Sequence, residues 1–322
     1  MKKIMALIAA LLVLCCAGCG QRAVQASSFA LDTEITVRIY AGGDEQDAEA
    51  ALARIDACER LLSAHREGSD IAAVNASGGQ PVQVDALTAR VLERALTIGR
   101  ETEGALDVTL LAVSALWDYR SESPRVPPQQ QIDEALRRKG MERILIEDNV
   151  VMADGVGVDL GAVAKGAIGD EAVETLRARG VTSALLNLGG NILTLGSKPD
   201  GSDWVVAIED PMGGGSVGTV AFSGSRAVAT SSGAQRYFEV DGVRYHHILD
   251  PETGYPAGSG IASATVLASD GLTADALSTA LFVMGEARAE RLLREVYPDC
   301  AAVLVRDDGT VRVLGDVRFA GE

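Results

Sequence analysis

The prediction of the fold starts from the stretch Val158-Asp159-Leu160-Gly161-Ala162-Val163-Ala164-Lys165-Gly166. Its apolar start predicts the end of a strand, and the helical spacing of residues 165–180 predicts that a helix follows the small residues directly. Free backbone groups at such a helix start are suited to contact a phosphate or a metal ion. Tight packing of a strand–helix turn accounts for the same residues and, for this motif taken alone, is the preferred explanation.

Two familiar phosphate-binding loops are excluded at this stretch. The spacing Gly155-x-Gly157-x-x-x-Gly161 misses the dinucleotide fingerprint by one residue, and its glycines lie inside the expected strand. The spacing Gly161-x-x-x-Lys165-Gly166 has lysine before glycine and no following Ser or Thr, so it is not a P-loop.

Strands and helices are expected on both sides of this stretch. Strands are predicted at 29–40, 143–146, 150–158, 183–195, 205–208, 217–222, 226–229, 235–240, 243–248, 262–268, 301–305 and 311–314. Helices are predicted at 47–63, 85–102, 133–139, 165–180, 272–284 and 286–297, with an exposed proline-rich loop at 121–131. Hairpins occur together with strand–helix alternation. We therefore predict a mixed α/β (α+β) fold with largely antiparallel sheets and flanking helices, not a pure doubly wound sheet.

The N-terminus predicts export. Lys2 and Lys3 precede the apolar run 4–14, which is too short to span a membrane and is typical of a signal peptide. The run ends in Cys16-Ala17-Gly18-Cys19, which resembles a lipobox with Cys19 as the acylated residue. Cys16 stands where Leu is usual, so a plain cleaved signal stays open. We expect a signal peptide at 1–18, a tether at 19–28 and one domain at 29–318.

The charge of the chain excludes some partners. The 322 residues carry 45 Asp and Glu against 29 Lys and Arg, a formal charge of −16, and loss of Lys2 and Lys3 would make it more negative. Nucleic acid and anionic lipid are therefore not expected as main partners, whereas one phosphate-bearing small ligand is compatible. Cys58 and Cys300 either pair or remain two buried thiols, and no zinc spacing exists.

A second cluster, Thr273-Ala274-Asp275-Ala276-Leu277-Ser278-Thr279-Ala280-Leu281, offers hard oxygen ligands. Asp275 and Thr279 are four residues apart and share one face of a helix. A carboxylate and a hydroxyl suit Mg²⁺, which completes its shell with phosphates and water. Without context, a first-turn helix acid and a helix-buried hydroxyl are the preferred explanation of the pair.

A third cluster, Tyr245-His246-His247-Ile248-Leu249-Asp250-Pro251-Glu252-Thr253-Gly254, contains two of the three histidines of the chain. His247 can relay a proton because its pKa, if unperturbed, is near neutrality. A histidine that only packs, or only forms a hydrogen bond, is the preferred explanation when this motif is taken alone. His246 and His247 are expected on opposite faces of a strand, so at most one of them acts.

Together with other segments, these clusters resemble the ApbE family of FAD:protein FMN transferases. The resemblance covers residues from about 29 to 314, and its motifs occur in the family's order. The motifs are Leu31-Asp32-Thr33, a serine-containing loop before Asn75, Gly104-Ala105-Leu106-Asp107, residues 159–166, Asn187-Leu188-Gly189-Gly190, Ala229-Thr230-Ser231, residues 247–254 and residues 274–281.

The resemblance implies a set of ligand contacts. It implies that Mg²⁺ is held by Asp275, Thr279 and the carbonyl of Ala162. It implies that FAD, as the substrate, contacts Leu31, His65, Ala105, Leu106, Asp107, Asp159, Ala162, Lys165, His247 and Ile248. Two positions depart from the family: His65 replaces a stacking aromatic ring and Asn191 replaces a common aspartate, and both bear on FAD affinity.

The implied reaction moves FMN from FAD to a threonine or serine hydroxyl of an acceptor flavoprotein and releases AMP. His247 is the candidate base, and Asp250 is its candidate orienting partner. The acceptors implied are flavoprotein subunits of membrane redox complexes, which fits an extracytoplasmic, lipid-anchored enzyme. An FAD pyrophosphatase and a non-catalytic FAD-binding lipoprotein are the alternatives. Asp275 and Thr279 argue against the latter, since binding alone needs no metal at the pyrophosphate.

Overall fold

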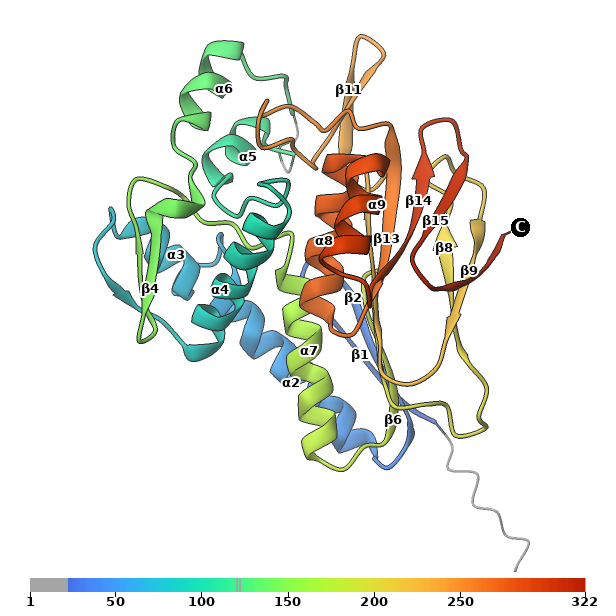
Figure 1. Cartoon of the computed structure of the whole chain (residues 1–322). Helices are drawn as coiled ribbons and strands as arrows, with labels where there is room; N and C mark the ends of the chain where they lie inside the picture. The colour runs from blue at the N-terminus through green and yellow to red at the C-terminus, as the bar shows by residue number, and fades with distance from the viewer. Residues whose placement is uncertain (1–22, 120, 122, 322) are drawn as a thin grey trace, which may run out of the picture.

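The computed structural model describes residues 23–119, 121 and 123–321 (Figure 1). The expected signal peptide at 1–18 and the lipidation of Cys19 lie outside the described residues. Within them, no helix combines the length and the apolar character needed to cross a membrane.

The elements alternate between strands and helices along the chain. The strands are β1 (Val24–Ala30), β2 (Thr33–Ala41), β3 (Val82–Gln83), β4 (Ile144–Glu147), β5 (Val150–Ala153), β6 (Ser183–Leu188), β7 (Asn191–Leu195), β8 (Trp204–Glu209), β9 (Ser216–Phe222), β10 (Ala227–Ser232), β11 (Tyr237–Val240), β12 (Val243–His246), β13 (Ile261–Ala268), β14 (Ala301–Arg306), β15 (Val311–Leu314) and β16 (Arg318–Gly321). The helices are α2 (Glu45–Leu62), α3 (Asp70–Ala76), α4 (Ala86–Glu101), α5 (Leu111–Trp117), α6 (Gln129–Leu136), the 3₁₀ turn η1 (Met141–Arg143), α7 (Ala164–Ala178), α8 (Gly271–Met284) and α9 (Glu286–Glu295).

The main sheet has eight strands in the order β1-β2-β6-β7-β10-β13-β14-β15, and its neighbours all pair antiparallel. Helices α2, α7 and α8 lie on one side of it, and the smaller sheet β16-β9-β8 lies on the other (Figure 1). Residues of β6 alternate between the two sides: Leu186 belongs to the large core under the helices, whereas Leu185 packs with Trp204 of the small sheet. This alternation is what a sheet covered on both faces requires.

Helix α8 is the most enclosed element. Of its fourteen residues only Thr279 and Val283 are not fully buried. A helix that is apolar all round is stable only inside a protein. Asp270 caps its start, where the side chain accepts a hydrogen bond from the backbone N–H of Thr273 at 2.8 Å. The helix therefore presents few groups to solvent, and its polar residues stand in the core.

A separate aromatic cluster supports the hairpin β11–β12. Trp117, at the end of α5, lies 5.5 to 6.2 Å from the rings of Tyr119, Phe238, Tyr245 and Tyr255. Its indole N–H donates to the carbonyl of Gly254 at 2.9 Å. The hairpin projects from the body of the molecule (Figure 1). Aromatic packing rather than a sheet neighbour therefore holds its inner face, because β11 and β12 pair only with each other among the described strands.

The predicted fold class is confirmed, but several boundaries differ. The expected single strand at 29–40 is the hairpin β1–β2, and β1 begins at Val24, inside the range expected to be a tether. The expected strand at 183–195 is the hairpin β6–β7, which turns at Gly189 and Gly190 with φ of 62° and 97°. Both are tight turns with positive φ, and such turns are not recognised in the sequence when apolar residues continue on both sides of them.

Other differences concern short elements. Helices α3 and α5 and strand β16 were not predicted, and α6 begins at Gln129 instead of residue 133. Strand β16 ends at Gly321, beyond the expected domain limit of 318. Strand β5 ends at Ala153, so the following glycines form an irregular segment, and β12 ends at His246, so His247 follows the strand. Helices of seven or eight residues give too few turns for a periodic pattern.

Candidate functional site

The start of α7 meets the start of α8 at two glycines. A Cβ placed on Gly166 would lie 2.0 Å from the carbonyl oxygen of Gly271, and one on Gly271 would lie 2.4 Å from that of Gly166. Only glycine allows two backbones to approach this closely. One turn further along α8, the side chain of Asp275 accepts a hydrogen bond from the Gly166 N–H at 3.0 Å. The close approach at Gly166 and Gly271 therefore places the start of α7 within hydrogen-bonding distance of the Asp275 carboxylate.

The carboxylate of Asp275 is buried and held on both oxygens. Oδ2 accepts from Gly166, and Oδ1 accepts from the Asn191 side-chain amide at 2.8 Å. Burial raises the pKa of Asp275, while the Lys165 charge and these hydrogen bonds act in the opposite direction. A carboxylate has about four acceptor sites, so acceptor capacity remains beyond these hydrogen bonds.

Thr279 lies on the same face of α8 as Asp275. Its hydroxyl is 3.0 Å from the hydroxyl of Ser231 on β10, which is also 2.9 Å from that of Ser278. Ala162 precedes α7 by two residues in the half-buried turn next to this face. Among the described residues no group of three His, Cys, Asp or Glu side chains could hold a metal. The donor set at α8 is instead one carboxylate, one hydroxyl and nearby carbonyls, which suits an ion that keeps water or phosphate ligands.

Lys165 joins the two halves of the predicted site. Its positive charge lowers the pKa of Asp275 and also that of His247, so it acts on both groups. Such mutual influence falls off with distance. The structure therefore brings Lys165 near a histidine and a buried acid that each lie more than 80 residues away from it in sequence.

His247 is half-buried, and its ring orientation is set by a carbonyl. Its Nδ1 lies 3.2 Å from the backbone oxygen of Arg236, which also accepts the His247 backbone N–H at 3.1 Å. A carbonyl only accepts, so Nδ1 carries the proton and Nε2 is the basic nitrogen. Burial, assisted by the charge of Arg236, lowers the pKa of His247 to about 4. The ring edge faces Tyr119 at 6.5 Å.

His246 has different surroundings. Its ring meets Phe282 edge-on at 5.2 Å, and Nε2 lies 3.2 Å from the carbonyl of Ala257. The expected placement of the two histidines on opposite faces of one strand does not apply, because β12 ends at His246.

Asp250 does not hold His247. Its side chain accepts from the Glu252 backbone N–H at 2.7 Å, and its own carbonyl accepts from Gly254 at 2.8 Å. Asp250 therefore closes the turn before Tyr255, as an aspartate at the first position of a turn commonly does. The hypothesis that it orients His247 was wrong for this structure: the carbonyl of Arg236 takes that position.

The turn between β1 and β2 joins the same neighbourhood. Leu31 and Asp32 have φ of 55° and 59°, a conformation that bulky residues rarely adopt. The Leu31 N–H donates to Glu59 at 3.1 Å, and Asp32 forms an ion pair with Arg236 at 3.8 Å. Strained turns of this kind occur at binding sites more often than elsewhere, and this turn contains the predicted flavin contact Leu31.

The segment 105–107 approaches Asp159 through its backbone. The Asp159 N–H donates to Val108 at 2.8 Å. The side chains of Ala105 and Leu106 are buried in the main core, so only their backbone can reach a ligand. The Asp107 carboxylate accepts from the N–H and hydroxyl of Thr109 at 2.8 and 2.5 Å. Ile248 is also buried, and Asp159 is half-buried, with its carboxylate on the N–H of Gly161.

His65 lies apart from these contacts. It is exposed in the loop after α2, where its backbone N–H donates to Ser63 at 3.2 Å, and among the described residues its ring has no partner.

Sequence reasoning missed three supports of the site: the carbonyl of Arg236, the carboxylate of Glu59, and Asn75. The Asn75 amide bonds both backbone groups of Val158, at 2.7 and 2.8 Å. A backbone carbonyl has no sequence signature, whereas Asn75 followed the recognised serine loop.

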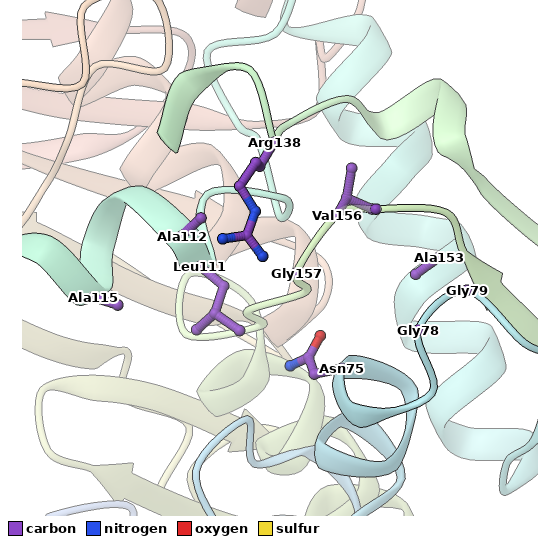
Figure 2. A pocket seen from close by; sticks show the side chains of 11 residues that line it. Asn75, Gly78, Gly79, Leu111, Ala112, Ala115, Arg138, Ala153, Val156 and Gly157 are labelled. Carbon is purple, nitrogen blue, oxygen red and sulfur yellow. The ribbon is translucent and has the colours of Figure 1, made fainter. Parts of the chain in front are cut away.

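A hollow of about 270 Å³ lies next to the irregular segment between β5 and Asp159. Figure 2 shows Arg138 pointing into it above Leu111 and Asn75, with the glycine-containing segment 155–157 at its side. None of the predicted site residues lines it. The hollow is therefore a neighbour of the site and not the site itself.

The fold is shared with solved flavin transferases, which defines the class of the protein. The ApbE protein of Thermotoga maritima has a TM-score of 0.85 and 33% identity, covering 91% of this chain and 97% of that one. The flavin transferase ApbE of Vibrio cholerae has a TM-score of 0.81 and 29% identity, again covering 91% and 97%.

The sequence comparisons agree with the structural ones. The sequence model of the ApbE family matches residues 31–304. The chain is 36% identical over 333 aligned residues to the FAD:protein FMN transferase of Treponema pallidum, covering 95% of this chain and 92% of the relative. It is 35% identical to the Vibrio cholerae enzyme of the same name over 254 residues, covering 77% and 76%. The chain belongs to the ApbE family.

Proposed function

We propose that the chain is a magnesium-dependent FAD:protein FMN transferase of the phosphotransferase type. It moves FMN from FAD to a threonine or serine hydroxyl of an acceptor protein and releases AMP. The transfer of FMN from FAD follows from membership of the family, whose relatives carry that name. The metal ion, the hydroxyl acceptor and the residue roles are the finer part of the proposal.

The observation that carries the metal proposal is the buried carboxylate of Asp275. Among the described residues no cationic side chain forms an ion pair with it, and neutral donors hold both of its oxygens. A buried anion without a paired charge is costly, and a divalent cation offsets that cost. Asp275, the Thr279 hydroxyl and the Ala162 carbonyl would hold Mg²⁺. Bound there, Mg²⁺ supplies charge neutralisation at the phosphoryl oxygens.

The other residues have roles that follow from their positions. Lys165, next to the helix start, adds positive charge where the pyrophosphate of FAD is expected. Nε2 of His247 accepts the proton of the attacking hydroxyl, because Nδ1 is already engaged by Arg236. Leu31 and the backbone of residues 105–107 bound the remaining space for the flavin or the adenosine.

One experiment separates the proposed activity from its alternatives. The enzyme is incubated with FAD, Mg²⁺ and a peptide that carries an acceptor threonine, and the products are identified by mass spectrometry. A peptide heavier by FMN, together with AMP, supports the transferase. Free FMN and AMP with an unmodified peptide would make the chain an FAD pyrophosphatase, and unchanged FAD would leave a flavin-binding protein.

We also propose that the mature enzyme is anchored by a lipid on Cys19 and acts outside the cytoplasm, on flavoprotein subunits of membrane redox complexes. The apolar run ending in Ala17-Gly18-Cys19 supports this. Cys19→Ser is expected to move the protein out of the membrane fraction or to leave the precursor unprocessed. Unchanged fractionation and processing of this variant would refute the anchor.

A further inference from the structure

Helices α7 and α8 cross through two matching segments, each a glycine followed four residues later by an aspartate. These are Gly166 with Asp170 on α7 and Gly271 with Asp275 on α8. The two aspartates act reciprocally. Asp275 accepts from the Gly166 N–H at 3.0 Å, and Asp170 accepts from the Gly271 N–H at 2.6 Å. One aspartate belongs to the proposed metal site, while the other lies on the far side of the crossing.

Asp170 does more than a helix cap requires. Its second oxygen accepts from the Leu272 N–H at 2.9 Å, so it bonds the first two amides of α8. That helix already has its own cap, because Asp270 accepts from Thr273. A capping side chain normally belongs to the residue just before its helix. An acid supplied by the neighbouring helix instead ties the two helices together.

Burying the carboxyl group of Asp170 at this crossing costs free energy. Burial, together with the nearby carboxylates of Asp270 and Glu171, raises the pKa of Asp170 to about 7, although both backbone N–H groups act against the shift. At the same crossing the glycines provide no side chains that could interlock. Interlocked side chains are what usually fixes the register of two packed helices. Here the hydrogen bonds of the two aspartates perform that task.

We propose that Asp170 is a positioning residue for the metal site: its two hydrogen bonds fix where α8 begins on α7. They thereby set the distance from Asp275 and Thr279 to the Ala162–Lys165 turn. The inference rests on the proposed metal site. The hydrogen bonds of Asp170 go to the backbone of Gly271 and Leu272 and not to the proposed metal ligands, so its effect is indirect and resembles that of outer-shell groups, which hold ligands in the geometry a metal needs.

The test compares Asp170→Ala and Asp170→Asn with the wild-type mature chain. The Mg²⁺ concentration that gives half-maximal FMN transfer is expected to rise on the order of tenfold, the usual cost of losing an outer-shell partner. The rate at saturating Mg²⁺ is expected to change little. Asparagine keeps one acceptor oxygen, so its effect should be smaller. In the metal-free proteins, hydrogen exchange at Leu272 and its neighbours should quicken.

The matched control is Asp44→Ala. Asp44 also accepts two backbone amides at a helix start, those of Gln46 and Asp47 on α2, but it is not part of the α7–α8 crossing. It should lower the thermal midpoint and leave the Mg²⁺ dependence unchanged. Thermal midpoints of all the variants show how much stability each has lost, and if Asp170→Ala does not fold, Asp170→Asn takes its place.

Three outcomes would overturn the inference. Asp170 variants could show wild-type Mg²⁺ dependence and wild-type exchange, or Asp44→Ala could shift the Mg²⁺ dependence as much as they do. In both cases the metal-site proposal survives, provided that wild-type transfer needs Mg²⁺. Wild-type transfer that ignores Mg²⁺ would instead refute the metal site, and the role of Asp170 with it.

Discussion

The two halves of the site are built in opposite ways. At the α7–α8 crossing, Asp275 is buried and bonded on both oxygens, inside the largest core of the molecule. At the hairpin β11–β12, His247 follows a projecting two-stranded ribbon, and one backbone carbonyl orients its ring. Preorganised charge needs a rigid, dry environment, whereas a group that meets a second protein must be accessible. Under the proposed mechanism, the buried half would therefore hold the metal ion, and the hairpin half would meet the acceptor protein.

The largest effect is expected from Asp275→Ala. Losing the only carboxylate of the proposed metal site should lower Mg²⁺-dependent transfer by about 10³-fold or more, since metal stabilisation is worth several kcal/mol. The fold should persist, because the change also removes a buried charge whose pKa is raised. Steady-state transfer assays and circular dichroism check both. Activity within a few-fold of wild type at the same Mg²⁺ demand would contradict the proposal that Asp275 holds the metal ion at the α7–α8 crossing.

His247→Ala should follow, with a loss on the order of 10² to 10⁴-fold in single-turnover transfer, the usual contribution of a general base. FAD binding should survive, because the Asp275 carboxylate and the helix start are untouched. His246→Ala is the control: it removes packing against Phe282 and should lower stability without lowering turnover. Normal turnover of His247→Ala at saturating FAD would reduce His247 to a packing residue.

The pH dependence is expected to report the buried histidine. Burial lowers the pKa of His247 to about 4, so the ring stays neutral and able to accept a proton well below its unfolded value of about 6.5. Transfer at saturating FAD and Mg²⁺ should therefore stay level as the pH falls through 6.5 and decline only towards 4. The unfolded chain binds the extra proton in this window, so the contribution of His247 to stability falls as the pH is lowered. A decline in transfer centred near 6.5 would show that the ring is solvated.

The smallest effect is expected from Asp250→Ala. The side chain bonds only the Glu252 N–H within its own turn, so transfer should fall no more than a few-fold, about 1 kcal/mol for one neutral hydrogen bond. The value of kcat/KM for FAD measures it. A loss approaching that of His247→Ala would mean that Asp250 orients the histidine during turnover, and the hairpin half of the site would then be better organised than its hydrogen bonds indicate.

Sequence patterns indicated the candidate site better than its supports. Helical periodicity predicts that Asp275 and Thr279 share one face of α8, and the structure has this helix, but only the family resemblance made a metal site the preferred interpretation of these residues. The turn at Leu31 and Asp32 was not predictable, since a bulky residue such as Leu31 rarely adopts positive φ. The roles of Asn191 and Asp170 depend on which helices and strands meet, and local propensity contains no such information. Asn191 was flagged for its effect on FAD, yet its amide holds Asp275.

The glycine pair at the crossing also constrains how this sequence can change over time. A methyl group on Gly166 would meet the carbonyl of Gly271, and one on Gly271 would meet that of Gly166, at 2.0 and 2.4 Å. Neither position can accept a side chain first and wait for the other to compensate, because each clash is with backbone atoms that no substitution removes. Descendants of this protein must therefore keep both glycines if the α7–α8 crossing is to persist.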